Sequence, residues 1–424
     1  MAGQKLVITE YGAIEGRDCT TAIQKVIDQA SAGDMVVVPK GIFLTGSLFL
    51  KNNMELHLEK GAVLMALQEE EAFPMIWTRV AGVEMEWPAA VINALGKDHV
   101  KITGEGCIDG HGEHWWRKYW GEDRMGGMRK EYDSQGLRWA VDYDCTRVRN
   151  VLIMNGTDIV IQGITSKRSG FWNIHLCYCR NVHVDGVHIC ENRGPSTDGI
   201  DIDSSSEVVV ENCDISCSDD NICMKAGRDA DGLRVNRVCE NVTVRNCVLR
   251  EGSGITLGSE TSGGIRNIFV DHISFYGTGC GFRIKSASTR GGILEHIRVS
   301  HLQMINVHTC FPFQLQWNPS YSLCEIPKEY DGVIPERWKI LTQAVPEKEG
   351  IPFVHDVKIS HVTADFTEDY PKEGKSVAFD LQGYPESPIT DVYLEDIRIR
   401  ARKFGNMEHV TGLICKNMEI TVES

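Results

Sequence analysis

The chain has 424 residues, 42% of them hydrophobic, and a formal net charge of −15. This length suits one large domain or two ordinary ones, and the composition is that of a soluble globular protein. So acidic a protein is a poor general partner for nucleic acids or anionic membranes, and an anionic substrate would need a local basic cluster. No apolar run approaches the roughly 18 residues of a membrane span.

The amino-terminal sequence MAGQKLVITEYGA lacks the charged-then-apolar pattern of a signal peptide. The sequence therefore predicts a cytoplasmic protein, or a secreted one if a leader has been removed. The cysteine count of 15 is high and odd. Cys177 and Cys179 lack the second pair that a zinc site would need. We interpret most cysteines as small, reduced, buried side chains on strands: Cys190, Cys213, Cys223, Cys247 and Cys415.

The first predicted element is a helix at about residues 20–31. Thr21 and Gln24 have the spacing of a capping box, and Ile23, Val26 and Ile27 form one apolar face. Short strands separated by turn residues follow in residues 35–66.

From about residue 98, a short pattern of alternating apolar and polar residues recurs every 23 to 35 residues or so, with one longer gap. Repeats of this length built from strands indicate a solenoid. Leucine-rich repeats would need regular leucines and a helix per turn, and a propeller blade would need four strands in about 40 residues. A parallel β-helix remains, forming a single domain over residues 1–424 with the amino-terminal helix as its cap. The copies occupy residues 158–164, 181–189, 207–215, 241–249, 267–275, 296–302, 356–362 and 391–397.

Two segments interrupt the repeat, residues 110–147 and 310–352. Long insertions on a rigid scaffold are typically functional loops. The first is rich in aromatic residues among charged ones, which suits the faces of sugars, although the same rings could simply pack the loop down. These residues are Trp115, Trp116, Tyr119, Trp120 and Trp139.

The most informative stretch is residues 196–225, where Asp198 and the pair Asp219–Asp220 each open an alternating run. If the two strands stack in register, Ile200 lies over Ile222 and Asp198 over Asp220, about 4.8 Å apart. Three carboxylates would then share one patch. Two further carboxylates of the stretch, Asp201 and Asp203, are interpreted as turn-stabilising residues.

The next coils supply Ser253 and then Arg283 and Lys285. Phe282 and Ile284 take the inward positions, so Arg283 and Lys285 face solvent on the same side as the carboxylates. Acidic groups beside cations that can bind a carboxylate suggest hydrolysis of a uronic-acid glycoside.

Four ordered motifs, Ser196-Thr-Asp198, Asp219-Asp220, Gly252-Ser-Gly254 and Arg283-Ile-Lys285, resemble the signatures of glycoside hydrolase family 28, the polygalacturonase family. The resemblance covers roughly residues 8 to 400. It implies a right-handed parallel β-helix and an inverting hydrolase without a cofactor.

Carried over by position, the resemblance makes Asp219 the general acid and Asp198 and Asp220 the pair that activates water. Arg283 and Lys285 would hold the carboxylate of an acidic oligo- or polysaccharide, and Ser253 would contact the substrate.

Two positions depart from the family pattern, which usually has Asn at position 196 and His at position 253. A serine hydroxyl carries no charge at neutral pH, so the sequence favours a branch with a different subsite, acting on rhamnogalacturonan or short oligosaccharides. If the insertions close one end of the cleft, the enzyme is an exo-acting galacturonidase.

Three alternatives stay open from the sequence. The first is a lyase of the same fold that uses clustered Asp to hold Ca²⁺, the second a non-catalytic carbohydrate-binding β-helix, and the third a hydrolase that has lost activity. The oligomeric state is not indicated.

Overall fold

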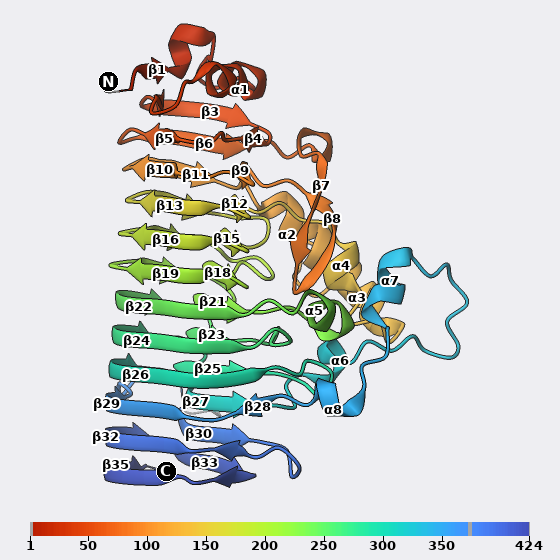
Figure 1. Ribbon diagram of the computed structural model, residues 1–424, viewed down its shortest axis with the longest axis vertical. Helices are drawn as coiled ribbons and strands as arrows, with labels where there is room; N and C mark the ends of the chain where they lie inside the picture. The colour runs from red at the N-terminus through yellow and green to blue at the C-terminus, as the bar shows by residue number, and fades with distance from the viewer. Residues whose placement is uncertain (1–2, 372–374, 424) are drawn as a thin grey trace.

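A computed structural model describes residues 3–371 and 375–423 and forms a parallel β-helix (Figure 1). Its coils alternate between two sheets, here called the short sheet and the long sheet. The short sheet has 11 strands: β4 (Leu48–Phe49), β9 (Ile92–Leu95), β12 (Val151–Met154), β15 (Ile174–Cys177), β18 (Ile200–Asp203), β21 (Ile222–Lys225), β23 (Ile255–Leu257), β25 (Phe282–Lys285), β27 (Thr309–Gln314), β30 (Val377–Gln382) and β33 (Lys403–Glu408).

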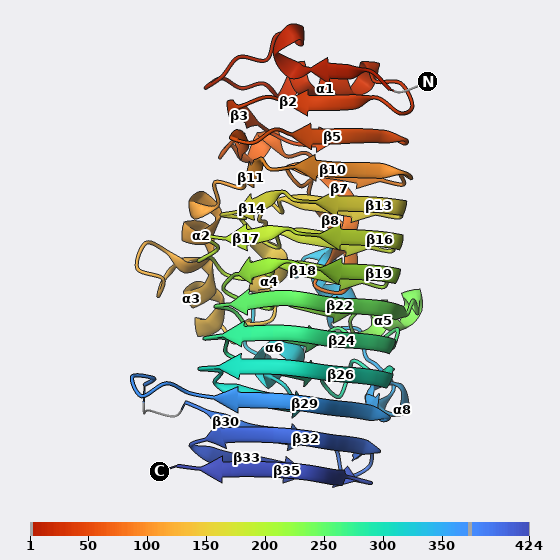
Figure 2. The same ribbon diagram turned by 90° about the vertical axis from the view of Figure 1, so that its left-hand side faces the viewer.

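The long sheet has 20 strands and forms the opposite side of the coil (Figure 2). Its strands are β1 (Lys5–Val7), β2 (Met35–Val38), β3 (Gly41–Thr45), β5 (Met54–Leu58), β6 (Ala62–Ala66), β10 (Val100–Gly104), β11 (Cys107–Asp109), β13 (Thr157–Gln162), β14 (Thr165–Lys167), β16 (Arg180–Asp185), β17 (His188–Cys190), β19 (Ser206–Glu211), β20 (Asp214–Ser216), β22 (Cys239–Arg250), β24 (Ile265–Tyr276), β26 (Ile293–Ile305), β28 (Phe353–Val354), β29 (Val357–Asp365), β32 (Val392–Ala401) and β35 (Ile414–Val422).

The remaining elements lie outside these two sheets. Two small pairs are the antiparallel hairpin β7 (Met75–Val80) and β8 (Val83–Pro88), and β31 (Ile389–Thr390) with β34 (Val410–Thr411). The helices are η1 (Ile8–Tyr11), α1 (Thr20–Gln29), η2 (Glu70–Ala72), α2 (Glu113–Trp120), α3 (Gly127–Ser134), α4 (Val141–Asp144), α5 (Asp229–Val235), α6 (Pro319–Ser322), α7 (Glu336–Leu341) and α8 (Glu347–Gly350).

The predicted sequence repeats form strands of the long sheet. Each copy begins at a residue whose φ lies between 53° and 58° and which lies within the first part of its strand or directly before it. Polar residues with short side chains tolerate this left-handed conformation best, which explains the Asn and Asp that open most copies. The alternating apolar residues then point inward and form one continuous core from Leu6 to Ala401.

The amino-terminal helix α1 covers the first coil, as predicted, and buries Ile23, Val26 and Ile27 in the core (Figure 1). The predicted capping box is wrong. Asp18 caps the helix instead, accepting the backbone N–H of Thr20 at 2.9 Å. The Gln24 side chain exchanges two hydrogen bonds with the backbone of Phe49 and so fixes the helix to β4.

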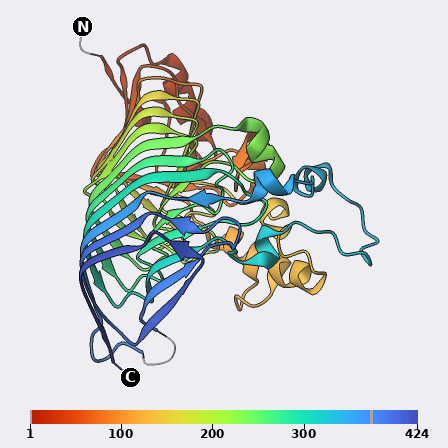
Figure 3. The same cartoon turned by 60° about the horizontal axis from the view of Figure 1, so that its bottom comes forward.

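The two insertions and the β7–β8 hairpin lie on the same side of the β-helix (Figure 3). The first insertion forms α2, α3 and α4. The second begins later than predicted, because residues 309–314 form β27 of the short sheet. A second apolar cluster, which includes Trp87, Trp139 and Trp338, joins the hairpin to both insertions.

The aromatic residues of the first insertion mainly pack that insertion down, so their predicted contact with sugars is wrong for the three buried ones. Trp115, Tyr119 and Trp139 are no more than 2% exposed. Of the five highlighted cysteines, three are buried, Cys190 is half-buried and Cys415 is exposed. In the described part of the chain, no helix has the length and apolar character needed to cross a bilayer.

Candidate active site

Four successive coils of the short sheet meet in the predicted register. Ile200 pairs with Ile222, Ile222 with Ile255, and Ile255 with Phe282. The residues that precede these strands, Asp198 and Asp219–Asp220, therefore lie at the same edge of the sheet. The carboxylates of Asp198, Asp219 and Asp220 each place an oxygen within 4.8 Å of the others, so the predicted three-carboxylate patch is present.

A cavity of about 320 Å³ opens over this edge. Its floor contains Asp198, Asp219, Ser253, Arg283 and Lys285, and so all but one of the residues predicted from sequence line it. The exception, Asp220, lies just beneath. Ser253 donates its backbone N–H to the Asp219 carbonyl at 2.7 Å, which links two neighbouring coils under the cavity. Ser196 also lines the cavity.

The cavity walls come from outside the repeat. The hairpin contributes Ala81, the first insertion Arg138 and Asp142, and the second insertion Trp317 and Tyr321. The last wall is anchored by a buried cation that sequence reasoning did not single out. Arg228 donates to the Tyr321 carbonyl at 2.7 Å and lies 4.6 Å from the centre of its ring.

Asp220 is surrounded by donors. Lys285 Nζ lies 2.9 Å from Asp220 Oδ2, Arg283 donates to Oδ1, and the Thr256 hydroxyl donates to Oδ1 at 2.8 Å. Burial alone would raise the pKa of Asp220, but Arg283, Lys285 and Lys225 outweigh it and hold this pKa far below the ordinary value. Asp220 is therefore a carboxylate at any ordinary pH.

The pKa values of Asp219 and Asp198 are shifted in the opposite direction from that of Asp220. Burial and then the neighbouring charge of Asp220 raise the pKa of Asp219. Burial, followed by the charges of Asp201 and Asp219, raises the pKa of Asp198 well above its ordinary value. Crowded carboxylates cannot all ionise together, so the group titrates as a coupled set in which some members keep their protons.

The prediction that Arg283 and Lys285 face outward is confirmed, but the prediction that they face solvent is wrong. Arg283 is 8% exposed and Lys285 4%, because the hairpin and the insertions cover this part of the short sheet. Lys285 lies 4.4 Å from the centre of the Trp317 ring. The hairpin and the insertions thus exclude part of the water from the charged face of the short sheet, where electrostatic interactions are therefore stronger.

Sequence reasoning missed Lys225 and Glu260, which also line the cavity. Lys225 Nζ lies 3.1 Å from Glu260 Oε2 and 5.1 Å from the centre of the Trp172 ring. The signal for Lys225 was present, since it is the next outward position after Asn221 and Cys223 in the alternating run. Glu260 carried no such signal, because it follows the end of β23.

Asp201 and Asp203 are not turn residues, contrary to the prediction. Both are fully buried on β18. Asp201 accepts the Cys223 thiol at 2.9 Å, and burial raises the pKa of Asp201 to about 8. Asp203 pairs with the buried Arg79 of the hairpin at 3.0 Å, which outweighs burial and lowers the pKa of Asp203.

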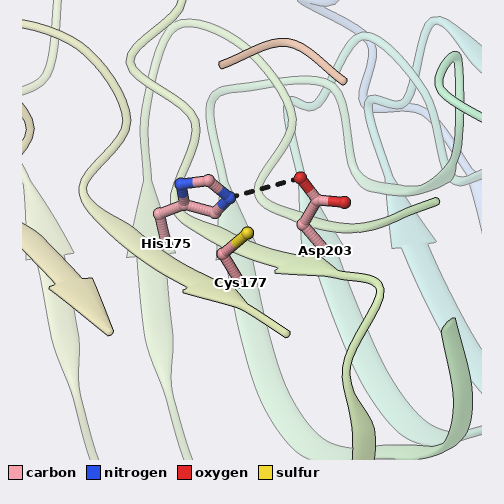
Figure 4. Close-up of side chains that lie close together, drawn as sticks. All are labelled: His175, Cys177 and Asp203. Atoms are coloured by element: carbon pink, nitrogen blue, oxygen red, sulfur yellow. Dashed lines mark hydrogen bonds and ion pairs between the residues drawn. The ribbon is translucent and has the colours of Figure 1, made fainter. Parts of the chain in front are cut away.

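Asp203 also lies close to His175 and Cys177, so that three potential metal-ligating atoms come together beside Arg79 (Figure 4). Burial lowers the pKa of His175 to about 4, so its ring is neutral. Arg149 approaches His175 Nδ1 at 2.8 Å, and Arg79 occupies Asp203. Two guanidinium groups beside the cluster disfavour a cation there, and we interpret it as the network that fixes the hairpin to the β-helix.

The family model for glycosyl hydrolases family 28 matches residues 34–324. A protein named probable polygalacturonase from Vitis vinifera is 28% identical over 408 residues, covering 92% of this chain and 73% of the relative. The exo-poly-alpha-D-galacturonosidase of Dickeya chrysanthemi is 27% identical over 318 residues, covering 67% of this chain and 52% of the relative.

Solved structures agree. The exopolygalacturonase of Thermotoga maritima superimposes with a TM-score of 0.78 at 25% identity, covering 99% of this chain and 94% of the other. The family 28 exopolygalacturonase of Yersinia enterocolitica has the same fold, with a TM-score of 0.77 at 20% identity over 99% of this chain and 77% of the other.

Proposed function

The chain belongs to glycosyl hydrolases family 28, and we propose that it removes galacturonosyl units from the ends of pectin-derived oligosaccharides. It is a polygalacturonase-type glycoside hydrolase, and the family implies a pectic galacturonan substrate. The observation that carries the finer proposal is the cavity itself, where Asp198, Asp219, Arg283 and Lys285 line one space and the third carboxylate, Asp220, holds the two cations.

Asp219 is the proposed general acid. Burial and the charge of Asp220 raise its pKa, so it keeps its proton to higher pH than an ordinary aspartate does, and it lines the cavity, where a glycosidic oxygen can reach it. Proton donation to the leaving oxygen is what an acid with a raised pKa does well. Asp220, one residue along, stays ionised, so the two neighbours differ in the way that acid catalysis requires.

Asp198 and Asp220 are the proposed pair that activates water. Asp220 contributes a permanent negative charge, and Asp198 lies across from it on the previous coil. Asp198 must lose its proton to accept one from water, although its surroundings raise its pKa.

Arg283 and Lys285 are the proposed partners of the uronate carboxylate. Both already hold Asp220, but a guanidinium has five N–H donors and an ammonium three, so each retains donors for a second carboxylate. Ser253 lies beside Asp219 and is placed to contact the same sugar with its hydroxyl.

Exo action is proposed for two reasons. The hairpin and both insertions wall the cavity, which limits how a long polymer could pass through. In addition, similar proteins include a named exo-poly-alpha-D-galacturonosidase and an exopolygalacturonase.

The experiment is to digest oligogalacturonides and rhamnogalacturonan oligomers and to identify early products by mass. Monogalacturonate as the sole early product supports exo action, while a ladder of mixed sizes rejects it. The same samples distinguish a lyase, whose unsaturated product absorbs in the ultraviolet and is lost with chelator. Calcium would have to share Asp220 with two cations, which weighs against that alternative.

Stereochemistry needs its own measurement. The family resemblance implies inversion, whereas the nearest oxygens of the three carboxylates lie within 4.8 Å, closer than the roughly 6.5–9.5 Å between the carboxyl groups of most inverting enzymes. We propose inversion. Proton NMR of the first product anomer checks it, and an α-anomer released from an α-linkage overturns it.

A further inference from the structure

One ammonium group in the site is shared by three carboxyl groups. Lys225 Nζ lies 3.1 Å from Glu260, 3.8 Å from Asp201 and 3.9 Å from Asp198. All four side chains are at most 5% exposed. A buried cation at the centre of three acids controls which of them can carry charge, because each buried charge needs a partner.

Glu260 takes the closest position on Lys225. Burial alone would raise the pKa of Glu260, but Lys225 and then Arg290 and Lys285 outweigh it and lower this pKa to about 2. Glu260 is therefore ionised. Asp198 and Asp201 share the more distant attraction that remains.

The other groups that face Asp198 and Asp201 do not replace Lys225. From the strand above, β15, the neutral His175 pairs with Asp201, and Arg149, which precedes β12, directs its guanidinium to His175 and the Arg79 carbonyl, not to these carboxylates. From the strand below, Cys223 contributes its thiol. Among the described residues, Oδ1 of Asp198 and Oδ2 of Asp201 accept no hydrogen bond.

Remaining neighbours are negative or already paired. Asp220 adds like charge, and Asp219 does so when it is ionised, while Arg283 and Lys285 are engaged with Asp220. Asp203, on the same strand as Asp201, is held by Arg79. Two like charges this close, with one shared cation, leave one proton on the pair.

We propose that Lys225 is a positioning residue that keeps Asp198 ionised, and that Asp201 holds the proton which the pair retains. Asp198 borders the cavity and has to receive a proton from water, whereas Asp201 is fully enclosed and contacts no substrate. The enclosure of Asp201 therefore places the proton there, on Oδ2, since Oδ1 already accepts the Cys223 thiol. This assignment rests on the proposed role of Asp198 in activating water. A measurement of catalytic activity depends on the same role.

The first experiment compares Lys225→Met, Lys225→Arg and wild type by the pH dependence of kcat/KM. Without the ammonium, Asp198 ionises only at higher pH, so the acidic limb should move up by about one pH unit or more. Lys225→Arg should return the limb towards the wild-type position. Lys101→Met is the matched control, because Lys101 is exposed on β10 of the long sheet. A loss by the same factor at every pH overturns the proposal.

The second experiment needs no activity. Infrared spectra at neutral pH report the C=O band of protonated carboxyl groups. The proposal expects this band to weaken in Asp201→Asn and, separately, in Asp219→Asn. An unchanged band in folded Asp201→Asn overturns the assignment of the proton. Because this readout is independent of substrate, it remains decisive if Lys225→Met does not fold, and a failure of the galacturonidase assay cannot be mistaken for a failure of this proposal.

Discussion

The two outer surfaces of the β-helix carry their charges differently. On the long sheet, ion pairs such as Arg250–Asp214 and Arg266–Glu240 link neighbouring coils at the exposed face. On the short sheet, the Arg283–Asp220 pair is buried, and Asp203 pairs with Arg79 of the covering hairpin. Both surfaces are built from the same kind of coil, so the hairpin and the insertions cause the difference in exposure of their ion pairs.

Burial beneath the hairpin and the insertions changes how strongly charged side chains interact. Exposed pairs are screened by water and contribute little to stability. Buried charges shift each other's pKa values. In this site the pKa of Asp220 is lowered and the pKa of Asp219 is raised. An acid and a permanently ionised neighbour can then coexist one residue apart. Substitutions on the two surfaces should therefore have very different effects.

The largest difference is expected for activity. Asp219→Asn removes the proposed proton donor and should lower kcat by about 10²–10⁴-fold, since leaving-group protonation supplies a gain of that size. Asp214→Asn, on the long sheet, is the control and should keep wild-type rates. Steady-state kinetics on oligogalacturonides measure both. Equal measurable rates would overturn the role of Asp219, and no turnover by either protein would favour a non-catalytic carbohydrate-binding protein.

The next largest difference is expected for stability. Arg79→Met leaves Asp203 buried with only His175 beside it, at 3.4 Å, and should lower the free energy of unfolding by about 3–5 kcal/mol. Chemical denaturation measures the loss. The double variant Arg79→Met/Asp203→Asn should recover part of it, because it no longer buries an unpaired charge. A single variant as stable as wild type contradicts the anchoring role given to this pair.

A third effect concerns pH. The folded pKa of Asp201, about 8, lies above its unfolded value of about 3.9. This carboxyl therefore favours the folded state most at low pH, and that contribution is lost as pH rises from about 4 to about 8. Asp201→Asn should not show this loss, so its Tm relative to wild type should rise over this range. Thermal melts across pH test it, and a constant difference in Tm refutes it.

The smallest effect is expected on the open surface. Arg250 is about half exposed, and Arg250→Gln should change the free energy of unfolding by about 0–1 kcal/mol. Salt titration of the melting temperature provides a second check, because an exposed pair weakens as ionic strength rises. A loss as large as that of Arg79→Met would remove the distinction between the two surfaces.

Local patterns in the sequence were sufficient to predict the β-helix, its cap and the register of the coils that carry the candidate site. Alternation specifies which side chains point inward, and stacking of identical coils leaves few other registers for Ile200, Ile222, Ile255 and Phe282. The local pattern alone therefore predicts that Asp198, Asp219, Asp220, Arg283 and Lys285 share one edge of the short sheet.

Only the tertiary structure decided how that edge is enclosed. The β7–β8 hairpin and the two insertions have no repeat, so their packing over the short sheet depends on long-range contacts such as Arg79–Asp203 and Arg228–Tyr321. Those contacts bury Lys225, Asp201 and Glu260 around one another, a grouping that spacing along the chain does not reveal. The sequence by itself determined which groups meet, while the covering segments determined how far water is excluded and hence which groups keep their protons.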